Sequence, residues 1–214
     1  MSSGRPSDGL TEYILRGTAI SHMVVTTTFV CARFLLRSDK KKRVQWDELW
    51  LLVGYVLFMA VTGVYLSKMS LLFRLLAVQE GRLEPYPGVA EDAFDAQETF
   101  FFTSPGLWLT LWSIKFSLLS FYKRIMVGIR LYLVLWWIVL SYCVAALLLS
   151  ILLHVTACGP TPASWFIAGG CGSDNVRKSL ISFWEGFAAD LTTDLMSKLS
   201  PLQIVQWDVL IVNR

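Results

Sequence analysis

Five long runs of apolar residues, separated by shorter polar stretches, constrain the fold of this chain more than any other feature. A helix needs about 20 mostly apolar residues to cross the hydrocarbon core of a bilayer. The runs cover about 11–36, 49–66, 100–122, 131–155 and a segment from about Leu180 past Pro201. The composition, with 55% hydrophobic and 16% charged residues among 214, also departs from that of a soluble domain. The sequence therefore predicts an all-α, polytopic transmembrane helix bundle in contact with the lipid bilayer.

The charges between the apolar runs predict the orientation of the chain. The loop after the first run is strongly basic, with three lysines and an arginine at 40–43, whereas the connection 68–99 is rich in Asp and Glu. Because basic loops face the cytoplasm, the amino terminus of this multi-pass protein is expected to be extracellular or lumenal.

The acidic connection is expected to be solvated surface, with a ligand or partner surface as the alternative. Its first part, 70–78, either lies in the membrane interface or prolongs the second run. The basic residues form no stripe with interleaved aromatic residues, so no nucleic acid is expected as a partner.

The cysteines and histidines lead to separate expectations. Cys158 and Cys171 bracket a turn-rich loop on the predicted outer side, where oxidising conditions favour a disulfide bond between them. Cys31 and Cys143 fall within apolar runs and are interpreted as small buried residues. His22, in the first run, is interpreted as hydrogen-bonded inside the bundle, with a proton carrier or ligand contact as the alternative. His154 is expected to lie at the membrane interface.

Small residues in the second and third runs predict close contact between helices. Gly54 and Gly63 offer surfaces that a neighbouring helix can approach closely. Ser113, Ser117 and Ser120 recur at the three-to-four spacing that places residues on one helix face. A second stripe of the same run is formed by Trp108, Trp112, Lys115, Leu119 and Tyr122. We expect one of the two stripes to face the interior of the bundle and the other to pack closely on a neighbour.

Lys115 is the most costly residue of the third run. It shares a face with Trp108 and Trp112, and a charge in a transmembrane segment costs several kcal/mol (roughly 3 or more) unless it finds a partner, water or a route to the interface. In the fifth run, Asp190 and Asp194 also share one helix face. Lys115 and Asp194 each lie about fifteen residues from the predicted outer ends of their helices, or roughly 22 Å at 1.5 Å per residue.

These matching depths lead to a specific hypothesis, an ion pair or water-bridged pair between Lys115 and Asp194. The alternative is that Lys115 extends towards the cytoplasmic face while Asp194 pairs with Lys198 one turn later.

Four motifs together resemble one family. They are IKFSLLSFYKRI in the third run, the loop C-G-P-x4-W-x5-C from Cys158 to Cys171, TTDLMSKLSP from Thr192 to Pro201, and R-x3-R-x9-D-E from Arg33 to Glu48. The chain is similar, over about Tyr13 to Ile204, to the fungal rhodopsin-like domain, which includes the satratoxin-cluster-type membrane proteins and relatives of the Pth-type receptors.

The resemblance implies a seven-helix bundle with its amino terminus outside, of which five spans are present here. It divides the chain into an amino-terminal tail at 1–10, an incomplete rhodopsin-like domain at 11–205 and a tail at 206–214 that does not match. Lys198 stands where the family has an apolar residue. Because the sixth and seventh spans are missing, a truncated gene model or splice form is expected.

Receptor-like sensing of a small-molecule ligand is the favoured function, with the basic loops available to a cytoplasmic protein partner. A second interpretation is a membrane enzyme or accessory protein of secondary metabolism, in which the two aspartates hold magnesium, and a third is a non-functional fragment. Retinal is suggested only by the family's name, so no cofactor is predicted. The sequence also predicts no metal site and no catalytic residue. The ligand pocket is expected to be lined by Trp108, Trp112, Lys115, Phe187, Asp190 and Asp194.

Overall fold

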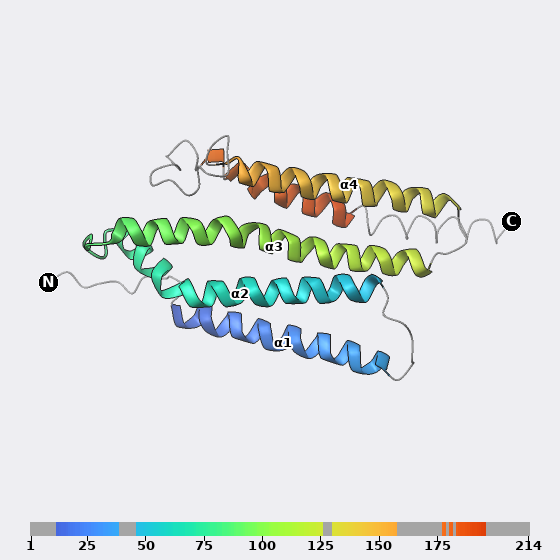
Figure 1. Cartoon of the computed structure of the whole chain (residues 1–214), viewed down its shortest axis with the longest axis horizontal. Coiled ribbons are helices and arrows are strands. Elements are labelled where there is room, and N and C mark those ends of the chain that lie inside the picture. Colours follow the sequence, from blue (N-terminus) through green and yellow to red (C-terminus); the bar gives the residue numbers. More distant parts are fainter. Residues whose placement is uncertain are drawn as a thin grey trace. The chain divides into compact units, whose positions relative to one another are not determined.

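The computed structural model describes residues 12–38, 46–125, 130–157, 177–178, 180–181 and 183–195, and this part of the chain is all-α. The labelled helices are α1 (Glu12–Ser38), α2 (Trp46–Gln79), α3 (Val89–Ile125) and α4 (Arg130–Val155). Residues 183–195 are also helical and run beside α4 in the orange-red part of Figure 1. The predicted helix-bundle fold class is confirmed.

Three of these helices have the length and hydropathy needed to cross a membrane: Glu12–Leu36, Trp46–Gln79 and Leu133–Val155. The third predicted span lies within α3, whose 37 residues include Pro105 and Lys115. Its polar and charged side chains explain why α3 is not among these three candidate spans. The helices are also longer than a bilayer requires, since the 34 residues of α2 extend about 51 Å at 1.5 Å per residue.

The connection between α2 and α3 is much shorter than predicted. The sequence indicated a polar connection from Lys68 to Thr99, but α2 continues to Gln79 and α3 already begins at Val89. Of the two alternatives for 70–78, prolongation of the second run is therefore the one found. The acidic residues at 91–98 lie on a helix, where Glu91 and Asp92 occupy the first turn and interact favourably with the positive end of the helix dipole.

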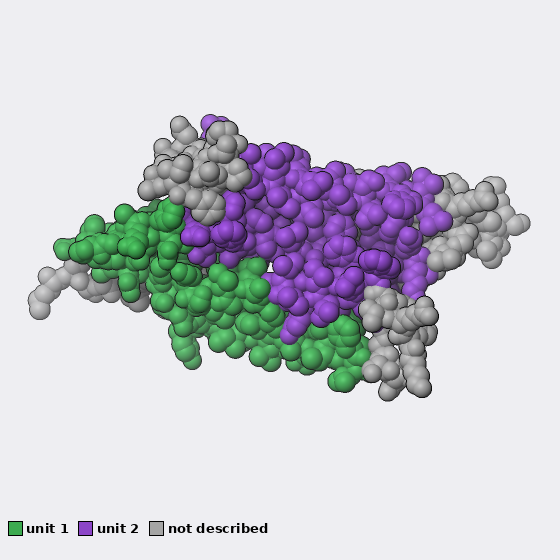
Figure 2. Space-filling model, in the orientation of Figure 1, with its two compact units in different colours: residues 1–42, 59–96 green, residues 43–58, 97–214 purple. Residues whose placement is uncertain are grey.

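The chain divides into two compact units, coloured separately in Figure 2. The first comprises residues 1–42 and 59–96, and the second comprises residues 43–58 and 97–214. Both α2 and α3 contribute residues to each unit.

In the first unit, a polar network holds the turn between α2 and α3. Lys68 Nζ lies 2.9 Å from Asp95 Oδ2, and the Tyr86 hydroxyl donates a hydrogen bond to Asp92. The Arg74 guanidinium lies 5.6 Å from the centre of the Tyr86 ring. The hydrogen bond to Asp92 is the main cause that raises the pKa of Tyr86 above 10.0. Gly88, with φ of 104°, adopts a backbone conformation that favours glycine directly before α3 begins.

Two expectations for α1 are wrong. His22 and Cys31 were interpreted as lying inside the bundle, but both are exposed. None of the 18-residue apolar window of α1 is buried, so nearly the whole helix surface is available to lipid. Within α1, an ion pair joins Glu12 and Arg16 at 2.9 Å, one turn apart.

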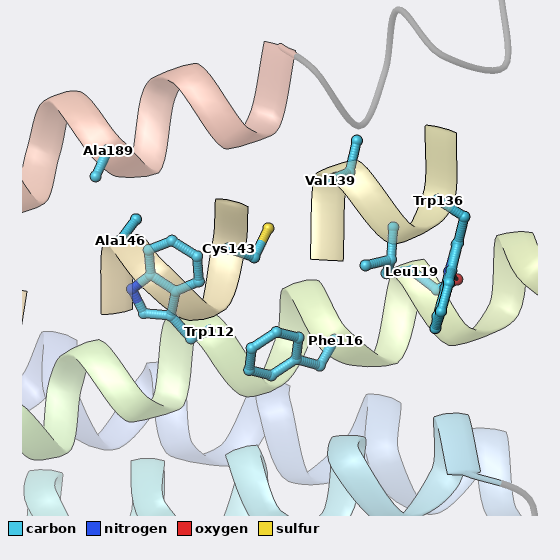
Figure 3. Close-up of a cluster of buried hydrophobic side chains, with 8 residues drawn as sticks. All are labelled: Trp112, Phe116, Leu119, Trp136, Val139, Cys143, Ala146 and Ala189. Carbon is cyan, nitrogen blue, oxygen red and sulfur yellow. Dashed lines mark hydrogen bonds between the residues drawn. The ribbon is translucent and has the colours of Figure 1, made fainter. Parts of the chain in front are cut away.

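The second unit has a small apolar core between α3 and α4 (Figure 3). The Trp136 indole N–H donates a hydrogen bond of 2.9 Å to the carbonyl of Leu119, which joins the two helices. Cys143 is 2% exposed, so its prediction as a small buried residue is confirmed. The core comprises Trp112, Phe116, Leu119, Trp136, Val139, Cys143, Ala146 and Ala189.

The serine stripe of α3 packs against the first half of α2. The Ser117 hydroxyl donates a hydrogen bond of 2.7 Å to the carbonyl of Asp47. A Cβ added to Gly54 would lie 3.2 Å from the Cβ of Ser113, so the backbones are as close as a glycine allows. Gly63 is different, because no described atom outside its own helix lies within 4 Å of such a Cβ.

Candidate functional site

The site is built around Lys115, whose side chain is 10% exposed in the middle of α3. Its ammonium lies 2.8 Å from Asp190 Oδ1 and 3.2 Å from Asp194 Oδ1. It also donates a hydrogen bond of 2.6 Å to the Asp190 carbonyl and another to the Thr193 hydroxyl. Four oxygen atoms therefore surround the ammonium: the Asp190 carbonyl and the Thr193 hydroxyl accept hydrogen bonds, and the two carboxylate oxygens make ion-pair contacts. This arrangement offsets much of the cost of burying the charge.

The helix at 183–195 presents all of these acceptors from one face. Asp190, Thr193 and Asp194 are spaced three and four residues apart, which places them on the same side of a helix. Thr193 is 0% exposed. Its hydroxyl lies 2.8 Å from the carbonyls of Ala189 and Asp190, to which it can donate while accepting from Lys115. The threonine thus fixes the position of the ammonium between the two carboxylates.

The predicted contact between Lys115 and Asp194 is present, but Asp190 is the closer partner. Asp194 is also the more accessible carboxylate, with 46% of its side chain exposed against 31% for Asp190. The alternative pairing involved Lys198, which lies outside the described residues. Depth matching along the two helices was therefore sufficient to find the contact, although it could not rank the two aspartates.

The other predicted pocket residues divide into two groups. The Trp112 ring lies beside the site, with its centre 5.1 Å from Lys115 Nζ, a distance at which a cation is attracted to the face of an indole. Trp108 lies nearer the beginning of α3, where its ring centre is 5.4 Å from that of His154. Phe187 is 55% exposed. The structure therefore brings Trp112, Lys115, Asp190 and Asp194 together.

Polar residues that the sequence analysis did not select hold α4 against the helix at 183–195. The Ser150 hydroxyl, which is 1% exposed, donates a hydrogen bond of 2.9 Å to Glu185 Oε2. Further along, the Tyr142 and Thr192 hydroxyls lie 3.1 Å apart. The sequence did offer one indication of this contact, because Ser150 and His154 lie one turn apart in an otherwise apolar run and can therefore face the same neighbour.

His154 was expected at the membrane interface, but it is buried. Its Nε2 lies 3.3 Å from the carbonyl of Phe101 in α3. Burial against α3 is compatible with that depth, which stays a prediction. The sequence did not show which face of the helix end a neighbour covers.

Cys158 and Cys171, the predicted disulfide pair, lie outside the described residues, so their pairing stays a prediction. The described residues contain no group of three or more His, Cys, Asp or Glu side chains arranged to hold a metal ion.

Comparison with known proteins identified one family. The family model described as the fungal rhodopsin domain matches residues 32–207, a range that includes every side chain of the Lys115 site. No curated protein and no solved structure matches the chain.

Proposed function

Because the chain belongs to the fungal rhodopsin domain family, we propose that it is a receptor-like membrane protein that senses a small molecule. The observation that carries this proposal is the ammonium of Lys115 shared by two carboxylates of another helix. Ionisable residues inside a membrane segment usually mark ligand, ion or proton sites. A ligand with its own charge competes for the same partners, and it therefore changes the packing of α3 against the helix at 183–195.

The geometry favours sensing over the magnesium-dependent alternative. The carboxylates of Asp190 and Asp194 both contact Lys115 Nζ, so a cation already lies between them where a magnesium ion would have to bind. A ligand that exchanges with the lysine shifts the balance between two helix arrangements only by its difference in affinity for them. This behaviour is that of a switch, and it requires no reaction.

The test is a gene replacement in the organism that encodes the protein. One strain carries Lys115→Met together with Asp190→Asn and Asp194→Asn, which removes the charges without leaving one unpaired. The control strain carries Lys68→Gln, which alters an ion pair elsewhere, and both proteins are first checked for equal abundance in membranes. We expect the triple variant to change the transcript profile and the control to leave it as in the wild type.

Two results would argue against this proposal. A triple variant whose transcripts match the wild type at equal abundance would indicate a structural role for the cluster. Accumulation of one isoprenoid precursor without a transcript change would instead favour the enzyme interpretation. The proposed receptor carries no retinal, so the purified protein is expected to show no absorbance in the visible range. A visible absorption band would indicate a retinal pigment.

A further inference from the structure

A cavity lies in the second unit, at the end where α3 stops and α4 begins. Its volume is about 610 Å³, within the range of roughly 300–1,000 Å³ typical of ligand pockets. The beginning of α2, the last turns of α3 and the first half of α4 form it, and none of the six predicted pocket residues lines it. Its apolar wall comprises Trp46, Trp50, Phe116, Leu119, Leu140 and Val144.

Two adjacent cations also line this cavity, Lys123 and Arg124 in the last turn of α3. The Lys123 ammonium lies 4.1 Å from the centre of the Trp136 ring and 5.7 Å from that of Trp137. This contact positions the ammonium at the cavity. An apolar wall and two positive charges therefore line one cavity that is partly open to its surroundings.

We propose that this cavity binds an anionic phospholipid of the surrounding bilayer. Lys123 and Arg124 contact the phosphate, while an acyl chain packs along the tryptophan and leucine wall. Three observations favour a lipid: the cavity is largely apolar, its charges are positive, and Trp46 and Val144 are exposed on helices that face the bilayer. Tryptophans are enriched where the hydrocarbon meets the headgroups.

The orientation predicted from the basic loops supports the same occupant. Lys123 and Arg124 belong to the end of α3 that is expected to face the cytoplasm, and anionic lipids are concentrated in the cytoplasmic leaflet. Long basic side chains at helix ends commonly extend to the headgroups without forming a site. Here the ammonium is instead placed beside the Trp136 indole, next to a cavity large enough for part of a lipid.

The experiment uses the full chain in vesicles of phosphatidylcholine and phosphatidylserine, with retained lipids identified by native mass spectrometry. The double variant Lys123→Gln, Arg124→Gln removes both charges. Its matched control is Arg177→Gln, Lys178→Gln, an adjacent and exposed basic pair on another helical segment. We expect about a 30-fold loss of phosphatidylserine affinity in the first variant, from two headgroup interactions, and no change in the control.

A third variant tests the apolar wall with the charges intact. Val144→Trp adds bulk at an exposed lining position, and we expect it to reduce phosphatidylserine retention as well. Glycerophosphoserine, the headgroup without acyl chains, is expected not to compete.

The proposal is overturned if the charge variant keeps wild-type retention or if Val144→Trp leaves retention unchanged. Equal competition by the free headgroup would also overturn it, because the site would then bind only a phosphate anion. None of these results depends on whether the Lys115 cluster acts in sensing.

Discussion

At the scale of single residues, Lys115 sets the strictest requirement in the second unit. A buried charge is tolerated only where its partners satisfy it, and removing one partner is more harmful than replacing the whole set. Lys115 meets this requirement through two hydrogen bonds and two carboxylate contacts on one short segment, 190–194. The contacts of Lys115 are therefore needed for α3 to pack against the helix at 183–195, whether or not they also form a ligand site.

This dependence predicts a rescue effect. Lys115→Met leaves Asp190 and Asp194 without their cation and is expected to cost on the order of 3 kcal/mol of unfolding free energy. Adding Asp190→Asn and Asp194→Asn is expected to restore most of that loss. Thermal unfolding in detergent measures both. The control, Lys68→Met, breaks a pair whose side chains are 39% and 47% exposed and is expected to cost only about 0–1 kcal/mol. A triple variant no more stable than Lys115→Met would contradict this account.

Tyr86 leads to a pH prediction outside the membrane spans. Its pKa is raised mainly by the hydrogen bond to Asp92, and Arg74 opposes the shift. Because the folded-state pKa exceeds the unfolded value, the stabilisation is complete below pH 10 and is lost as the pH rises through the folded-state pKa.

Asp92→Asn is expected to lower the pKa of Tyr86. An ultraviolet titration, with the Tyr86→Phe variant subtracted to remove the other tyrosines, measures it. An unchanged midpoint would show that the hydrogen bond to Asp92 does not control the titration.

At the scale of elements, close helix contact depends on which small residues have a neighbour. The sequence singled out Gly54 and Gly63 on the same helix, yet only the Cβ position of Gly54 meets another helix. The periodicity of α2 could not distinguish them, because small residues in an apolar run look alike whichever face is covered.

The two glycines provide a matched pair of variants. Gly54→Leu is expected to push α2 away from Ser113 and to destabilise the protein by about 1–3 kcal/mol, as overpacking does. Gly63→Leu adds the same side chain where no described atom of another segment lies nearby, and it is expected to change stability little. The comparison is made by thermal unfolding of both variants in the same detergent. Equal losses would show that helix propensity, and not contact with α3, decides the result.

At the scale of the whole molecule, the described residues show the distribution expected of a protein in lipid. Buried positions are often small or hydroxylated, whereas many large apolar side chains are exposed. Small residues let helices approach closely, and lipid can accept apolar surface that water cannot. Buried examples are Ser113, Ser117, Ala146, Ser150, Ala189 and Thr193. Exposed examples are Val24, Phe29, Leu52, Val56, Ile138, Leu148 and Leu152.

Membrane insertion and orientation lead to one further prediction. The protein is expected to remain in the membrane pellet after alkaline carbonate treatment. After reduction, an impermeant thiol reagent added outside intact cells or vesicles of the native orientation is expected to label Cys158 and Cys171. Without reduction neither cysteine is expected to react, because they are predicted to form a disulfide. Release by carbonate would contradict the membrane assignment, and labelling of only one of the two after reduction would contradict a shared outer loop.

The sequence by itself determined the medium and the element type, because long apolar runs can satisfy their backbone in hydrocarbon only as helices. It also predicted the contact between Lys115 and Asp194, since helix periodicity and depth follow from residue counting. The tertiary structure alone decided that Asp190 is the closer partner, that His154 is covered while His22 and Cys31 are not, and that a cavity forms beside Lys123. These features depend on which faces meet, and a helix whose whole surface is apolar carries no local signal of its neighbour.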